Sequence, residues 1–265
     1  MKAPERRRPL LVGLGDSWFD YFALDLFDRL EEHPGLEVLS LAHAGTRLAS
    51  MQVDPAQLLA LDSLLAQGRE PAAILLSVGG NDVVNDVLAG LLEPAAAAEP
   101  DKVRWRQAAR DQRIHVEMAR QLKQLLDTLI TLCDRHLPRR PVPLLLHGYD
   151  HPYPDGRGTM GTGWSTWLAP AFGQHGYAFG PATIAAMREL IDELNRMQAS
   201  VAQGFGARVQ NVDLTGTLPT TRANYQRYWG NELHPTPEGF RLLAARLLDA
   251  VQQVGVKPLP LPLLE

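Results

Sequence analysis

Short apolar runs alternate along the chain with longer segments in which apolar residues recur every three or four positions. The runs lie at residues 9–14, 36–42, 72–78, 142–148 and 207–214. The first four are almost continuously apolar, which is typical of strands buried on both faces of a parallel sheet. The pattern therefore predicts five β-strands.

The segments between these runs have the apolar spacing of helices. One predicted helix runs from Phe19 to Leu30, where apolar residues follow i, i+3, i+4, i+7 spacing, and the His-Pro-Gly of residues 33–35 ends it. A last helix begins at Pro237, with Thr236 as its cap. The other predicted helices are residues 54–68, roughly 103–136, and 181–203.

Alternating strands and helices indicate a parallel sheet with helices on both faces. No linker interrupts the pattern, so we expect residues 1–265 to form a single domain. The one long irregular stretch is 149–180, which is rich in aromatic and glycine residues. Loops of this length are usually functional or disordered, and the aromatic residues argue against disorder.

Composition excludes several classes of protein. The chain has 265 residues, 45% of them apolar, and a net charge of −4, which favours a soluble globular protein and gives no reason to expect nucleic acid as a partner. No apolar stretch approaches the ~18 residues of a membrane span. The apolar run after the first arginines is shorter than the ~7–15 residues of a signal peptide core, so we expect a cytoplasmic protein. The single Cys133 has helical spacing with several leucines and is predicted to be a core residue.

Residues that could take part in catalysis follow several of the predicted strands. Ser17 in "GDS" comes after the first strand, Gly45 in "HAGTR" after the second, Asn81 in "GGND" after the third, and His234 lies just before the last helix. Ligands of parallel α/β sheets bind at the carboxyl ends of the strands, so these residues are expected at one edge. An isolated "GDS" is also an ordinary turn followed by a helix cap.

These four blocks, in this order, resemble the SGNH (GDSL-type) hydrolase family over nearly the whole chain. The resemblance implies a three-layer α/β/α flavodoxin-like fold with a five-stranded parallel sheet. It implies that Ser17 is the nucleophile, with His234 as its base. The backbone N–H groups of Ser17 and Gly45 and the side-chain amide of Asn81 would form the oxyanion hole. We further expect Ser17 to start a helix, whose positive end would face the developing negative charge.

One position departs from the family pattern. The family usually has an Asp three residues before the histidine, and this chain has Asn231 there. An amide oxygen can accept the imidazole N–H and fix its tautomer, but it carries no full charge. Asn231 is therefore a candidate third catalytic residue, and the alternative is a turn residue beside a backbone carbonyl that orients His234.

The sequence predicts a serine esterase or lipase-like hydrolase that acts on a small-molecule ester through an acyl-enzyme and needs no cofactor. No dedicated metal-binding spacing is present. An acyltransferase or thioesterase using the same site, or a non-catalytic binding protein of the same fold, are the alternatives. Four residues of the long loop, Tyr149, His151, Trp164 and Trp167, are candidates for substrate contact, unless the loop packs only on itself.

Overall fold

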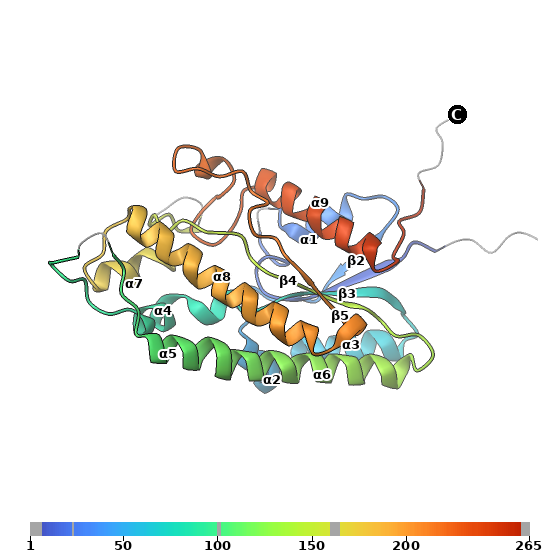
Figure 1. Ribbon diagram of the computed structural model, residues 1–265. Coiled ribbons are helices and arrows are strands. Elements are labelled where there is room, and N and C mark those ends of the chain that lie inside the picture. The colour runs from blue at the N-terminus through green and yellow to red at the C-terminus, as the bar shows by residue number, and fades with distance from the viewer. Residues whose placement is uncertain (1–6, 23, 100–101, 160–164, 261–265) are drawn as a thin grey trace, which may run out of the picture.

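The computed structural model describes residues 7–22, 24–99, 102–159 and 165–260, and its centre is a five-stranded parallel sheet (Figure 1). The strand order is β2-β1-β3-β4-β5, as in flavodoxin-like folds. The predicted three-layer α/β/α class is confirmed, and each strand lies within one residue of its predicted run. The strands are β1 (Leu10–Gly15), β2 (Glu37–Ser40), β3 (Pro71–Ser77), β4 (Leu144–His147) and β5 (Val209–Val212).

Burial of the strands follows their place in the sheet. All residues of β1 and β4 are buried, whereas β2, at one edge, is only partly covered. Gly15 ends β1 opposite Ser77 of β3 with a φ of +132°. A Cβ at this position would lie 1.9 Å from the Ser77 carbonyl oxygen, so only glycine lets the next residues, Asp16 and Ser17, follow the strand this closely.

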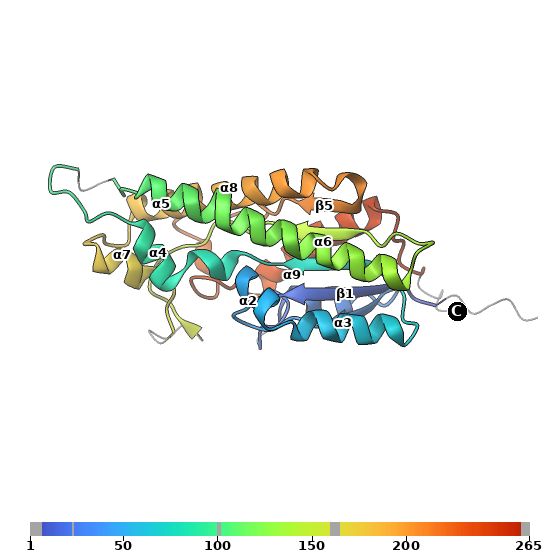
Figure 2. The same ribbon diagram turned by 90° about the horizontal axis from the view of Figure 1, so that it is seen from below.

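Helices cover both faces of the sheet (Figures 1 and 2). On one face, α1 (Leu26–Glu31) packs against α9 (Pro237–Gln253). On the other face, α6 (Ala119–His136) packs against α2 (Leu48–Val53), α3 (Ala56–Ala66) and α8 (Pro181–Gln203). The remaining α-helices are α4 (Asn85–Leu91), α5 (Gln107–Asp111) and α7 (Ala169–Gln174).

Several helix predictions are confirmed in detail. The Thr236 side chain accepts the Gly239 N–H at the start of α9, and α8 has the predicted bounds. The helix predicted at 103–136 begins four residues later, at Gln107. It runs as α5, continues through a π-helical turn (Gln112–Met118) and then becomes α6. Cys133 is buried in α6, and burial raises the pKa of its thiol to about 11, as befits a core residue.

The prediction of a helix from Phe19 to Leu30, starting at Ser17, is wrong. Helix α1 begins only at Leu26, because the Asp25 carboxylate accepts the N–H groups of Phe27 and Asp28 in a capping box. Ser17 lies in a turn instead, and Phe22 is 65% exposed. No helix dipole therefore begins at the predicted nucleophile.

Among the described residues, no helix is long and apolar enough to cross a membrane.

Candidate active site

The two residues predicted as nucleophile and base lie in hydrogen-bond contact. Ser17 follows β1 and His234 precedes α9, and the Ser17 hydroxyl donates to His234 Nε2 at 2.7 Å across 217 residues of sequence. The other ring nitrogen, Nδ1, donates to Asn231 Oδ1 at 3.1 Å. The two bonds are satisfied by one neutral tautomer, with the proton on Nδ1 and a lone pair on Nε2 that accepts the Ser17 hydroxyl.

Asn231 is held with its amide oxygen toward the imidazole. Its Oδ1 also accepts the backbone N–H groups of Leu233 and His234, and its Nδ2 donates to Tyr21 Oη at 2.9 Å. The Tyr21 ring stacks on the His234 ring, with centroids 3.9 Å apart and planes 7° apart. Tyr21 could not be predicted from the sequence, because no spacing relates an aromatic residue after the first strand to an imidazole near the last helix.

Burial sets the protonation state of His234. The imidazole is buried, and the loss of hydration lowers its pKa to about 3. No carboxylate replaces the lost hydration, since the residue beside Nδ1 is the amide of Asn231. His234 is therefore neutral near neutral pH and able to accept a proton from Ser17.

The three predicted oxyanion donors lie at the same strand edge. The described residues provide no acceptor for the backbone N–H groups of Ser17 and Gly45. Asn81 Nδ2 donates one hydrogen to Thr46 O at 3.1 Å, which leaves its second hydrogen for another acceptor. Gly45 has a φ of +79°, and a Cβ there would meet nothing within 4 Å. The positive φ angle, and not a lack of space for a side chain, is therefore what favours glycine at position 45. The space next to its Cα is open.

Buried polar side chains hold the nucleophile turn in place. The Asp16 carboxylate accepts the hydroxyls of Ser77 and Tyr149, both at 2.6 Å, and the Trp18 N–H. Burial nevertheless raises the pKa of Asp16 to about 6. The Trp18 indole N–H donates to Leu233 O at 3.0 Å, which ties this turn to the loop that carries His234.

A second buried connection joins the nucleophile turn to the glycine block. The Gln57 side chain accepts the Gly15 N–H and donates to both Gly15 O and Thr46 Oγ1. The Asp82 carboxylate accepts the Leu48 N–H and pairs with Arg113, so it supports the loop rather than facing the site. Gln57 was not predicted, because a glutamine on a helix gives no sequence signal of such a contact.

A profile of the GDSL-like lipase/acylhydrolase family matches residues 10–242. The chain belongs to this family. No curated protein matches the sequence at a significant level.

Several solved structures of lipases and esterases share the fold of this family member. A putative GDSL-like lipase from Parabacteroides merdae has a TM-score of 0.55 at 12% identity, covering 95% of this chain and 98% of its own. A carbohydrate acetylesterase from Sinorhizobium meliloti has a TM-score of 0.55 at 13% identity, covering 93% and 99%. An extracellular lipase from Streptomyces rimosus has a TM-score of 0.52 at 18% identity, covering 92% and 99%.

The segment 149–180 of this GDSL-like protein, predicted to be irregular throughout, contains helix α7, and a buried carboxylate anchors the segment. Glu232, two residues before His234, is fully buried and accepts backbone N–H groups from the loop at 2.7–3.0 Å. The four donors are Gly156, Trp167, Leu168 and Ala169. The carboxylate thus fixes the loop to the histidine block without contacting the imidazole.

The predicted substrate-contact residues lie in different surroundings. Trp167 packs edge-on against the His234 ring at 5.4 Å and lines a cavity at Ser17. Tyr149 lines a second cavity beside Ser17, where its hydroxyl is bonded to Asp16. His151 donates to Asp192 and lines neither cavity. Trp164 lies outside the described residues.

Other aromatic residues of the loop pack within the protein. Phe172 and Tyr177 are buried against each other, and the Tyr177 hydroxyl donates to Glu93 O. His147, at the end of β4, is also a packing residue. It is buried against Trp18, and burial lowers its pKa to about 4. The loop therefore combines a self-packed part with one indole beside the imidazole.

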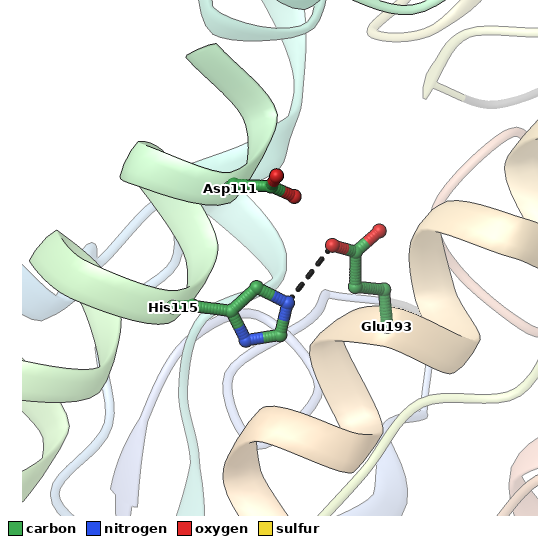
Figure 3. A group of neighbouring side chains, drawn as sticks. All are labelled: Asp111, His115 and Glu193. Carbon is green, nitrogen blue, oxygen red and sulfur yellow. Dashed lines mark hydrogen bonds and ion pairs between the residues drawn. The ribbon is translucent and has the colours of Figure 1, made fainter. Parts of the chain in front are cut away.

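One group of side chains has the donor types of a metal site. Asp111, His115 and Glu193 gather between the α5–π-turn segment and α8 (Figure 3), and their possible ligand atoms lie within 4.8 Å of one another. However, Glu193 already accepts from His115 at 2.9 Å and pairs with Arg110 at 2.9 Å. The carboxylate charge is matched by a guanidinium, so this group is better described as an ion-pair cluster. The absence of a metal requirement stays a prediction.

Replacing Glu232 by glutamine should destabilise the protein. Each carboxylate oxygen accepts two backbone N–H groups. In glutamine, the side-chain NH₂ group would replace one of these oxygens, and two of the backbone N–H groups would lose their acceptor. Leaving such buried groups unsatisfied costs about 1–3 kcal/mol each. We expect Glu232→Gln to lower the free energy of unfolding in urea by about 3 kcal/mol. Glu238→Gln, which removes an exposed pair with Arg241, is the control and should change it little. Equal stabilities of the two variants would contradict the anchoring role.

Proposed function

We propose that this protein is a serine-dependent carboxylic ester hydrolase that acts through an acyl-enzyme. The observation that carries the proposal is the 2.7 Å hydrogen bond from Ser17 Oγ to His234 Nε2, with Nδ1 bonded to Asn231. A hydroxyl next to an oriented, neutral imidazole is the arrangement of an activated nucleophile. Membership of the lipase/acylhydrolase family supports the same kind of reaction.

In the proposed mechanism, Ser17 Oγ attacks the ester carbonyl while its proton passes to His234 Nε2. The oxyanion that forms accepts from the N–H groups of Ser17 and Gly45 and from Asn81 Nδ2. The C–O bond to the alcohol then breaks, and His234 returns the proton to the departing oxygen. Water attacks the acyl-Ser17 ester in the same way, giving its proton to His234, and the free acid leaves as Ser17 regains its hydrogen.

Asn231 and Tyr21 would share the task that an aspartate has elsewhere in the family. Asn231 Oδ1 accepts the Nδ1 proton and fixes the tautomer, but it offers no charge to the imidazolium. The stacked Tyr21 ring presents its electron-rich face to the same imidazole. A cation over an aromatic face gains about 0.5–2 kcal/mol, so this stacking would partly offset the missing carboxylate.

Replacing Ser17 by alanine should abolish ester hydrolysis and preserve the fold. The variant loses the attacking oxygen but no backbone contact. We expect kcat/KM for p-nitrophenyl acetate to fall by at least about 10³-fold, and by up to about 10⁶-fold, the scale for loss of a catalytic serine. Ser200→Ala, an exposed position on α8, is the control. If Ser17→Ala protein with an unchanged melting temperature kept the activity of this control, Ser17 would not be the nucleophile.

The pH dependence tests the role of Asn231. The acid limb of kcat/KM reports the free enzyme's base. Because burial lowers the pKa of His234 to about 3, wild type should stay active well below pH 6.5, the ordinary value for histidine. Asn231→Asp places a negative charge beside Nδ1 and favours imidazolium, so the acid limb should move upward by about 1–3 pH units.

Asn231→Ala provides the matched comparison, since it removes the acceptor without adding charge. We expect a lower kcat, because the tautomer is no longer fixed. An unchanged kcat in this variant, together with an unmoved acid limb in Asn231→Asp, would show that a different group orients His234.

A further inference from the structure

Ser17 lies between two cavities of very different size. One, of about 40 Å³, is lined mainly by apolar side chains from β-strand ends, α8 and the long loop. The other, of about 610 Å³, opens beside His234. A water-sized group occupies roughly 10–15 Å³ on this scale, so the small cavity holds only about three or four such groups.

The placement of the catalytic groups assigns a part of the ester to each cavity. Gly45 and His234 both line the large cavity and neither lines the small one. In the tetrahedral intermediate on Ser17, the oxyanion points at its donors and the departing alcohol must reach His234 Nε2. The alcohol therefore lies in the large cavity. The acyl chain, which is the remaining substituent of the intermediate, therefore lies in the small cavity.

The small cavity suits a short hydrocarbon chain. Trp18, Ile191 and Trp229 are among its walls. The two carboxylates that line it are already satisfied: Asp16 accepts three hydrogen bonds, and Asp150 accepts the N–H groups of His151, Gly216 and Leu218. Neither carboxylate is thus free to bind a polar group, and the small volume of the cavity favours an acyl group of about four carbons or fewer.

The large cavity combines aromatic and acidic side chains. Tyr21, Phe22 and Trp167 line it, and three carboxylates, those of Asp20, Asp25 and Asp28, lie among them. Among its described lining residues there is no lysine or arginine. Phe22 is 65% exposed, so its ring is accessible to a ligand in this cavity. Aromatic faces beside negative charges favour an organic cation.

We propose that the preferred substrates of this protein are esters of a short acyl group with a larger, positively charged alcohol. The inference rests on the proposed function, because it uses the Ser17–His234 pair to place the two halves of the ester. It adds a binding site for an ammonium-type group formed by Phe22 and Trp167 together with Asp20 and Asp28.

The charge part of the proposal is tested with two substrates of the same shape. Acetylcholine carries a quaternary ammonium, and 3,3-dimethylbutyl acetate has a neutral carbon in its place. We expect wild type to show a kcat/KM about tenfold higher for acetylcholine, and the ratio to fall as salt is added. Equal values for the two esters would overturn the proposed cation site.

Variants that neutralise single carboxylates test whether the preference for the charged ester arises in the large cavity. Asp20→Asn and Asp28→Asn keep an oxygen that accepts the existing hydrogen bonds from Ala44 and Asp25, and each removes one charge from the cavity. Each should lower the acetylcholine to dimethylbutyl acetate ratio by several-fold. Glu31→Gln is the control, because this exposed residue of α1 carries the same charge and lies outside the cavity lining. A control that changed the ratio as much as Asp20→Asn would also overturn the site.

The acyl part is tested with p-nitrophenyl acetate, butyrate and octanoate. We expect kcat/KM to fall about tenfold or more from butyrate to octanoate, because the longer chain overfills the small cavity. Ile191→Ala should raise the octanoate to acetate ratio. Ile184→Ala, on the same helix but outside both cavities, should not. A ratio that rises with chain length in wild type would overturn the assignment of the small cavity.

These outcomes are separable from failure of the proposed function. If folded wild-type protein hydrolysed none of the esters, neutral or charged, the serine hydrolase proposal itself would fail, and this inference with it. If it hydrolysed all of them with no preference for charge or chain length, the hydrolase proposal would stand and only the substrate assignment would be wrong.

Discussion

The hydrogen bond between Ser17 and His234 joins the first strand to the last helix, and the rest of the site depends on keeping these two segments together. Their separation of 217 residues means that no local structure can hold the bond. The bond from the Trp18 indole to Leu233 O and the Asn231–Tyr21 contact span the same gap. A buried Asp16 on one side and a buried Glu232 on the other fix each segment to its surroundings.

The strands could be predicted because buried parallel strands have a strong sequence signal, and their carboxyl ends necessarily share an edge. The blocks that follow them therefore predicted where Ser17, Gly45, Asn81 and His234 would meet. The helix after Ser17 was predicted wrongly because apolar spacing continued through Phe19, whereas the Asp25 cap decided where the helix begins. Apolar periodicity indicates which face of a segment is buried, whereas capping contacts determine where the helix begins and ends.

The contacts missing from the sequence analysis are all long-range and polar or aromatic. Tyr21 against His234, Gln57 between Gly15 and Thr46, and Glu232 beneath the long loop have no characteristic spacing. The loop itself gave two alternatives, substrate wall or self-packing, and it contains both: Phe172 lies in the core while Trp167 lies beside the imidazole. Only three-dimensional contacts distinguish such residues.

Covalent capture of the nucleophile tests the central claim most directly. A fluorophosphonate mimics an ester carbonyl, and a serine activated by an imidazole displaces its fluoride to form a stable phosphonyl ester. Intact mass followed by peptide mapping should show one adduct, on the peptide that contains Ser17, and prior denaturation should prevent its formation. An adduct on another serine, or none on folded protein, would contradict the account.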